Sequence, residues 1–287
     1  MIQESKMLNH YNLSHDQIKR YSEAPQDKDY YYFYKYIYFN GDLNVLNIFS
    51  NNTLSFKHPT KFNDPFDCHF ALDIDYSKFD VHVFNRLTKK SISQTQFRQK
   101  KQHFLKHLKT VFDPESFRNS YRNNMGVTCF TTTPLNILMW SHYTDSHKGF
   151  LLEFKFPKND KANPPPIPIL YEDSYPVLKL KVETMHDFHN KDFITKLLNK
   201  VYLTKASEWK YENEFRMLLP GEGFHKFNPK LLSSVIFGVS TPPNDKKLIL
   251  NSLKEFNEKN NMSVQSFNAE ISKQEYKLTV KKHPRIF

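Results

Sequence analysis

The alternation of hydrophobic and polar positions is clearest between residues 126 and 156. Residues 127–130 form a short apolar run, which predicts a buried strand. At residues 150–156 an apolar side chain recurs at every second position, which predicts another strand. Between them, Thr133 can cap a helix that begins at Pro134. Helical spacing then places on one face Leu135, Leu138, Met139 and His142. A short connection that presents reactive side chains between two strands is typical of a functional site.

The same patterns predict the rest of the framework. Strands are expected at 30–38, 54–56, 169–171, 209–219, 234–239 and 262–267. Helices are expected after Asp42, within 77–124, at 192–205 and after Thr241. We therefore expect an α+β fold, in which a polar segment at 1–29 precedes a single domain at 30–287. This domain should contain a mixed or antiparallel split sheet and a helical insertion at about 77–124.

The composition agrees with one large globular domain that is strongly basic. The 287 residues include 26 Phe and 16 Tyr, enough aromatic surface for a substantial core. The formal net charge is +11 at pH 7, and residues 98–109 form a basic run, RQKKQHFLKHLK. This charge favours phosphate-rich partners, so RNA or DNA could bind through a basic helical face. The alternative interpretation of the run is a solvated helix face.

The spacing of the cysteines and the polar first residues both bear on the cellular compartment. Cys68 and Cys129 are far apart and form no C-x-x-C motif, which favours free thiols in a reducing environment. Residues 1–21 are polar, and no apolar run approaches the length of a membrane span. We therefore expect a cytoplasmic protein without a membrane contact.

Several common kinds of active site have no motif in the sequence. The chain has six glycines and contains no G-x-G-x-x-G, P-loop or G-x-S-x-G. His142 and His147 are five residues apart and do not share a helix face, as paired metal ligands on a helix would. Other ligands would have to come from Asp64, Asp67, Glu212 and Glu214. The sequence therefore predicts no metal site.

Two other stretches, residues 209–219 and the loop at 63–67, carry candidate functional side chains. The period of two along 209–219 places Glu212, Glu214 and Arg216 on one strand face. The structural alternative for this face is an exposed ladder of ion pairs.

The loop N-D-P-F-D at 63–67 has two interpretations. Asn and Asp side chains bond readily to their own backbone and Pro65 restricts the chain, which favours a rigid turn. A functional loop would place Asn63 or Asp64 at the rim of a pocket.

Four motifs occur in order along the chain. They are YKYIYF at 34–39, LSFKHPTKFNDPFDC at 54–68, CFTTTPLNILMWSHYTDSHKGFLLEF at 129–154, and W-x-x-E-x-E-x-R at 209–216. Together they resemble a bacterial family catalogued as domain of unknown function 2971, over roughly residues 30–240. This resemblance implies a family without naming a reaction.

The order of predicted elements also resembles the ADP-ribosyltransferase fold, in which a late strand carries E-x-E. This resemblance implies NAD as the substrate, with Glu214 holding the nicotinamide ribose while nicotinamide leaves. Glu212 would orient the acceptor, and Arg216 would keep a carboxylate ionised. A carboxylate suits this reaction because the transition state of glycosidic cleavage is oxocarbenium-like.

Further residues are assigned by position in that fold. Thr131 would help orient Glu214, and Tyr143 or Trp140 would stack on nicotinamide. The candidate set is catalytic Glu214, Glu212, Tyr143 and His142, and NAD-binding Lys35, Tyr36, Asn63, Asp64, Thr131, Trp140 and Arg216. The structural alternatives are core positions for Met139 and Trp140, a satisfied buried His142 and a buried Cys129 thiol.

These features lead to one expected function and two alternatives. The expected function is an NAD-consuming ADP-ribosyltransferase or NAD glycohydrolase. By analogy it would be a toxin or anti-phage effector that modifies nucleic acid or a translation component, with an antitoxin or regulatory protein as a partner. A metal-dependent nuclease would use Asp64, Asp67, His142 and Glu214. A noncatalytic module would bind nucleic acid or a partner protein through the basic helical face.

Overall fold

The computed structural model describes residues 13–111, 113, 115, 116, 119, 122, 124–184 and 200–286. The chain divides into two compact units. One, the sheet unit, comprises residues 1–57, 126–169 and 208–287, and the other, the insertion unit, comprises 58–125 and 170–207. The insertion unit is thus built from two separate stretches of the chain.

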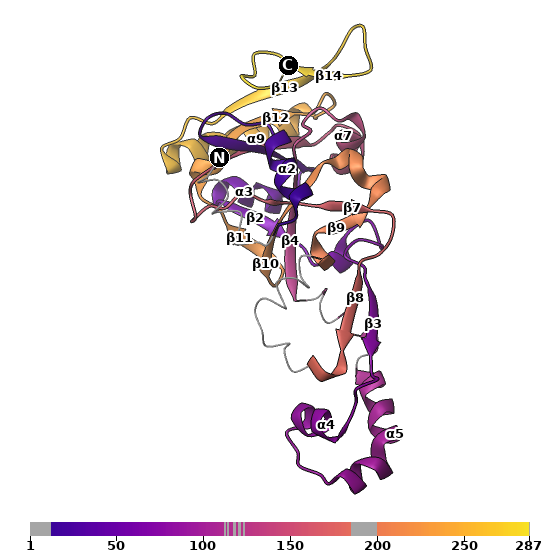
Figure 1. The fold of residues 1–287 in the computed structure, drawn as a ribbon. Coiled ribbons are helices and arrows are strands. Elements are labelled where there is room, and N and C mark those ends of the chain that lie inside the picture. Colours follow the sequence, from indigo (N-terminus) through magenta and orange to yellow (C-terminus); the bar gives the residue numbers. More distant parts are fainter. Residues whose placement is uncertain are drawn as a thin grey trace. The chain divides into compact units, whose positions relative to one another are not determined.

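An eight-stranded sheet is the framework of the sheet unit (Figure 1). Its strands are β1 Tyr30–Ile37, β4 Met125–Thr131, β5 Phe150–Pro157, β6 Ile167–Pro168, β10 Glu214–Pro220, β12 Leu232–Phe237, β13 Gln265–Ile271 and β14 Leu278–Val280. They follow the order β14-β13-β12-β5-β1-β4-β10-β6. β12 and β13 are parallel, whereas β1 is antiparallel to both β4 and β5. The structure therefore confirms an α+β fold with a mixed, mostly antiparallel sheet.

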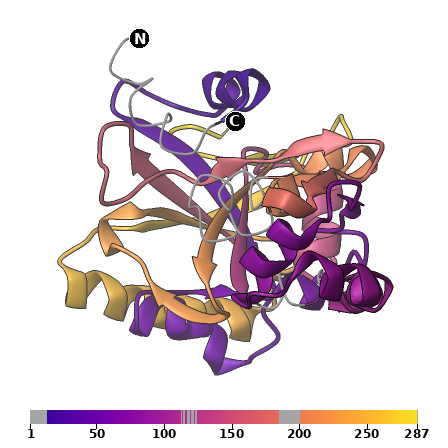
Figure 2. The same ribbon diagram turned by 60° about the horizontal axis from the view of Figure 1, so that its bottom comes forward.

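Helices and a hairpin complete the sheet unit. The α-helices are α2 His15–Glu23, α3 Asn47–Ser50, α7 Ile137–Tyr143 and α9 Pro243–Asn260. The 3-10 helices are η2 Leu43–Leu46, η5 Ser207–Glu212 and η6 Pro229–Leu231. The short strands β2 Thr53–Phe56 and β11 Gly223–Lys226 pair antiparallel. Figure 2 shows the gold α9 beside α3, with which it packs. η2 begins after Asp42, which caps it as the sequence predicts.

Both faces of the sheet are covered by apolar side chains. Phe150, Leu152 and Phe154 of β5 belong to a large core cluster that also contains residues of α2, α3 and α9. Leu151, on the opposite face, belongs to a second cluster with Trp140 of α7. A polar side chain on either face of β5 is therefore removed from water and needs a partner.

The helix predicted from Pro134 begins later than expected. The Asn136 side chain accepts hydrogen bonds from the Leu138 and Met139 backbone N–H groups, so Asn136 is the N-cap of α7. Thr133 is not the cap, and its hydroxyl instead pairs with the Thr131 hydroxyl at 2.9 Å. The prediction of a helix between the two strands is confirmed, and its predicted start is wrong.

The insertion unit contains two helices and two pairs of short strands. The helices are α4 Val81–Thr88 and α5 Gln94–Val111, which lie within the helical stretch predicted at 77–124 (Figure 1). The parallel pairs are β3 Ala71–Asp75 with β8 Val177–Lys181, and β7 Leu170–Glu172 with β9 Thr204–Ala206, and a 3-10 helix, η3, spans Pro59–Lys61. Of the helix predicted at 192–205, residues 192–199 lie outside the described residues and 204–206 form β9. None of the described helices is long and apolar enough to cross a membrane.

Candidate active site

The charged motif near residue 214 is divided between two elements. Glu212 ends η5, Asn213 adopts a left-handed conformation with φ 46°, and β10 begins at Glu214. The prediction that Glu212 shares a strand face with Glu214 and Arg216 is therefore wrong. The left-handed residue redirects the chain between the two carboxylates.

Glu214 and Arg216 form a buried ion pair on one face of β10. Arg216 Nε lies 2.6 Å from Glu214 Oε1, and Nη2 lies 3.3 Å from Oε2. Glu214 is 3% exposed and Arg216 is 0% exposed, so the exposed ion-pair ladder is also wrong. A guanidinium that binds a carboxylate through two nitrogens keeps the carboxylate ionised and fixes its orientation.

Glu212 is held by its side chain and by its main chain. The Tyr143 hydroxyl of α7 donates to Glu212 Oε1 at 2.5 Å, and the Thr131 hydroxyl donates to the Glu212 carbonyl at 2.5 Å. Glu212 is buried, and Tyr143 is half-buried. Thr131 is thus next to the carboxylate motif, as predicted, but its hydroxyl contacts Glu212 rather than the Glu214 side chain. The structure brings Tyr143, Thr131 and Glu212 together.

The connection between β4 and α7 is fixed by three side-chain donors. The Tyr36 hydroxyl donates to the Thr133 carbonyl at 2.8 Å, and burial raises its pKa well above the ordinary value. Trp140 Nε1 donates to the Pro134 carbonyl at 2.8 Å. Asn136 Nδ2 donates to the Tyr211 carbonyl at 3.1 Å, which ties this connection to η5. The sequence prediction missed Asn136. It could have been recognised as a helix cap, because an Asn directly before an apolar helical run is a typical N-cap.

Trp140 lies in the core. Its side chain is 0% exposed, and its ring packs edge-on against Tyr36 at 5.2 Å between centroids. The predicted stacking of Trp140 on nicotinamide is therefore corrected to a core position, because no face of the ring is open. Met139 is also buried, which confirms the structural alternative for both residues.

Cys129 lies on β4, the strand next to β10, and Lys35 lies on β1, the strand beyond β4. Lys35 Nζ donates to the Cys129 carbonyl at 3.1 Å and lies 5.6 Å from the centre of the Phe130 ring. Burial lowers the Lys35 pKa. Burial, followed by the nearby Glu214 carboxylate, raises the Cys129 pKa far above its usual range. The Cys129 thiol is therefore protonated at neutral pH, although the residue is half-buried and not fully buried as the structural alternative supposed.

The two histidines after α7 differ in their surroundings. His142 is exposed, so the prediction that it is a satisfied buried histidine is wrong. His147 is half-buried and its ring stacks on Trp140 at 6.2 Å between centroids, and burial lowers its pKa. His147 has a φ of 68°, and a Cβ on Gly238 would lie 2.1 Å from its carbonyl oxygen. Gly238 is therefore required by close approach of the two backbones.

Asn63 and Asp64 belong to the insertion unit. Asp64 is 5% exposed, and its Oδ1 accepts the Phe66 backbone N–H at 2.9 Å, which confirms the predicted turn. Asn63 is exposed. Asp67 is paired with Lys205 at 3.7 Å. Within the described ranges, no three or more His, Cys, Asp and Glu side chains gather so as to hold a metal ion.

Arg20 of α2 supports the carboxylate motif from outside the sheet. Its guanidinium donates to the Ile169 carbonyl and, at 3.1 Å, to the Glu214 carbonyl. It also lies 4.8 Å from the centre of the Phe215 ring. The sequence assigned no chemistry to residues 1–29, because nothing local links a basic residue of this helix to a strand near residue 214.

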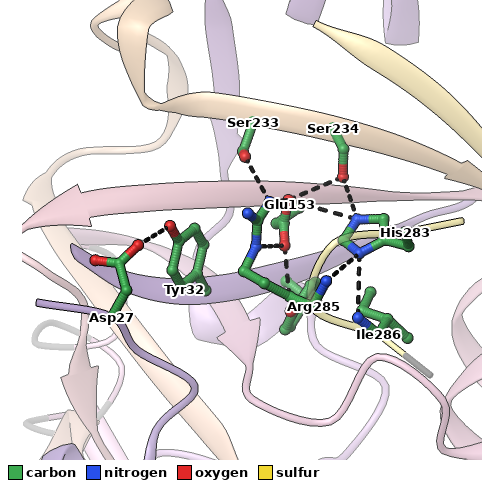
Figure 3. A network of polar contacts seen from close by, with 9 residues as sticks. Asp27, Tyr32, Glu153, Ser233, Ser234, His283, Arg285 and Ile286 are labelled. Carbon is green, nitrogen blue, oxygen red and sulfur yellow. Dashed lines mark hydrogen bonds and ion pairs between the residues drawn. The ribbon is translucent and has the colours of Figure 1, made fainter. Parts of the chain in front are cut away.

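Another buried carboxylate, that of Glu153 on β5, was also missed (Figure 3). Glu153 is 0% exposed, and Arg285 binds it with Nε 2.9 Å from Oε1 and Nη2 2.5 Å from Oε2. Tyr34 and Ser234 donate to the same carboxylate at 3.3 and 3.0 Å. An acidic residue inside an apolar strand could have indicated a buried carboxylate, but the residues that bind it are far away in sequence and could not be identified.

Ser234, His283 and Glu153 lie close together without forming a nucleophilic triad. The backbone N–H groups of Arg285 and Ile286 both donate to His283 Nδ1 at 3.2 Å, so Nδ1 carries no proton. The neutral ring then carries its proton on Nε2, which lies 3.0 Å from Ser234 Oγ and donates to it. His283 therefore cannot accept the serine proton in this state, and the cluster fastens the C-terminal segment to the sheet.

The fold and the site define an α+β protein with a cluster of buried acidic, basic and hydroxyl side chains at β4, α7 and β10. Residues 139–217 match the family model described as Protein of unknown function (DUF2971), which confirms the family predicted from the motifs. This matched segment includes Tyr143, Glu212, Glu214 and Arg216. Neither the curated proteins nor the solved structures give a significant match to the chain.

Proposed function

We propose that this protein consumes NAD, as an ADP-ribosyltransferase or an NAD glycohydrolase, with Glu214 as the central carboxylate. The supporting observation is that two buried carboxylates, Glu212 and Glu214, flank a single left-handed residue, Asn213. Tyr143 and Arg216 hold them in place. In a bacterial cytoplasm such an activity would serve as a toxin or anti-phage effector, controlled by an antitoxin or regulatory protein.

The proposed reaction breaks the bond between nicotinamide nitrogen and C1′ of the ribose. The bonding electron pair leaves with nicotinamide, and positive charge develops on the ribose. Glu214 would stabilise this charge, because a preorganised carboxylate acts more strongly where water is excluded. Water or an acceptor nucleophile then bonds to C1′ and loses its proton, which Glu212 would accept. Tyr143, bonded to Glu212, would orient that carboxylate.

Burial places a requirement on substrate entry. Glu212 is 2% exposed and Glu214 is 3% exposed, so NAD reaches them only after neighbouring side chains move. Tyr143, whose hydroxyl donates to Glu212, is half-buried and therefore partly open to solvent. Such movement on substrate binding is common where an active site excludes water.

The test is nicotinamide release from NAD by purified protein, alone and with RNA, DNA or cell lysate. Glu214→Gln should lower the rate by about 10²-fold or more, because a neutral amide does not stabilise a positive charge. Glu212→Gln should reduce transfer to an acceptor more than it reduces nicotinamide release. Glu255→Gln, an exposed site on α9, is the matched control and should leave both rates unchanged.

Folding has to be separated from chemistry, because Glu214→Gln removes one charge of the buried Glu214–Arg216 pair. Breaking one side of a buried pair costs roughly 3–5 kcal/mol. Glu214→Gln combined with Arg216→Gln removes both charges, and its thermal unfolding shows whether the chain still folds. A folded wild type that releases no nicotinamide under any of these conditions overturns the proposal, as does a folded Glu214→Gln variant with full activity.

A further inference from the structure

The insertion unit carries a basic helix that the proposed chemistry does not use. The 18 residues of α5 include five Lys or Arg and no Asp or Glu. The comparison within the chain is α9, also 18 residues long, in which four lysines are accompanied by three acids, Asp245, Glu255 and Glu258. The positive charge of α5 is therefore not neutralised along the helix itself.

The helical period separates the apolar and basic side chains of α5. Phe97 and Phe104 pack with Phe84 of α4 in a small aromatic core. At about 100° per residue, one flank then carries Arg98, Gln102, Lys106 and Lys109, all of which are exposed. We call Arg98, Lys106 and Lys109 the basic stripe. In the part of the chain that the structure describes, none of the three takes part in an ion pair.

A hollow lies beside the basic stripe. Its volume is about 630 Å³, and Gln102, Lys106 and Lys109 line it together with Asp113. Two ammonium groups, an amide and the Asp113 carboxylate thus line a space that is large enough for part of a polar ligand.

We propose that the basic stripe binds the phosphate backbone of a nucleic acid. Lys and Arg side chains that are not neutralised by a carboxylate complement a regular polyanion when they recur along a helix, and binding releases its counterions. The Lys109 ammonium lies 5.8 Å from the centre of the Tyr76 ring, a contact that leaves its charge in place. α5 contributes none of the large exposed apolar side chains of the described chain, so it lacks the apolar face that a membrane-bound helix inserts. It also lacks the exposed aromatic anchors that are typical of protein interfaces.

The test is fluorescence anisotropy with a labelled 20-nucleotide RNA and a 20-base-pair DNA over a range of salt concentrations. If each residue of the stripe neutralises one phosphate, log K for the duplex should fall against log salt with a slope of about −3 from the stripe alone. Replacing Arg98, Lys106 and Lys109 by Glu should remove this slope and weaken binding about a hundredfold at 0.1 M salt.

A matched variant separates local contact from net charge. Lys247→Glu, Lys254→Glu and Lys273→Glu change the net charge by the same amount at exposed positions of the sheet unit. The inference expects near wild-type binding from this variant, and equal loss in both triple variants overturns it. Stronger binding to anionic vesicles or polyglutamate than to nucleic acid also overturns it.

If the Glu variant of the stripe does not fold, Arg98→Gln, Lys106→Gln and Lys109→Gln test the same residues. Nicotinamide release is measured separately, so this inference stands or falls independently of the chemistry proposed for Glu214.

Discussion

At the scale of single residues, buried charge in this protein is stabilised by partners from distant parts of the chain. Burial alone would raise the pKa of Glu153, but the hydrogen bonds and charge of Arg285 outweigh burial, and the pKa is lowered. Burial lowers the pKa of His283, although Glu153 opposes this effect. The ionised carboxylate and the neutral imidazole are therefore the states that the folded C-terminal segment requires.

These two residues make stability depend on pH. The unfolded histidine binds a proton below about pH 6.5, whereas the folded His283 has a lower pKa and binds it only at lower pH. Stability should therefore fall as pH decreases from about 6.5 to the folded pKa of His283, by at most ~1.4 kcal/mol per pH unit. The Glu153 contribution is present above about pH 4.5 and is lost as pH falls through its lower folded pKa.

Urea unfolding at a series of pH values measures this dependence. In His283→Gln, the amide oxygen can still accept the backbone N–H groups of Arg285 and Ile286, but the side chain does not titrate. The difference in unfolding free energy between wild type and variant should change between pH 6.5 and 5. A constant difference across this range would show that His283 does not carry the effect.

At the scale of elements, the connection between β4 and α7 fixes the position of η5. Asn136 caps α7 with its Oδ1 and reaches the Tyr211 carbonyl with its Nδ2. Asn136→Ala should lower the unfolding free energy by about 1–2 kcal/mol, because it removes a helix cap and leaves that carbonyl without this donor. Chemical unfolding measures the change.

Asn136→Asp separates the two roles of this side chain. The carboxylate can still cap α7, and its charge is favourable at a helix N-terminus, but it cannot donate to the Tyr211 carbonyl. We expect α7 to stay protected from hydrogen exchange while the amides of η5 exchange faster. If η5 keeps its wild-type protection in this variant, the Asn136–Tyr211 contact does not position the segment.

Local patterns predicted much of the sheet and little of its partners. Aromatic and apolar runs identified β1 and β12, and the period of two identified β5. The same period predicted a strand over residues 209–213, where a 3-10 helix and a left-handed Asn213 occur instead. Over only five residues, the alternation of polar and apolar side chains does not distinguish a strand from a 3-10 helix.

The candidate site shows a similar division. The sequence identified Glu212, Glu214 and Tyr143 from their residue types and motif, and the structure brings Tyr143 and Glu212 into contact. It did not identify Arg20 or Asn136, because their roles depend on which backbone carbonyls the fold places beside them. Such contacts have no signature in the local sequence.

At the scale of the whole molecule, the two compact units have cores of different extent. The sheet unit is built around a large cluster that extends over several strands and the helices α2, α3 and α9. The insertion unit contains a smaller cluster around Phe84 and Phe97, with exposed polar residues on most of α5. Since stability grows with buried apolar area, the insertion unit should open at a lower free energy than the sheet.

Hydrogen exchange with mass spectrometry tests this difference directly. Amides of α4 and α5 should be less protected than those of β1 and β5 in the wild type. Phe84→Ala should cost the insertion unit roughly 3–5 kcal/mol and abolish most of its remaining protection, with β1 and β5 unchanged. Phe154→Ala, a substitution of the same type in the sheet core, should reduce protection of β1 and β5 instead. If Phe84→Ala reduces protection equally in both units, the chain unfolds as one cooperative body despite its two separate cores.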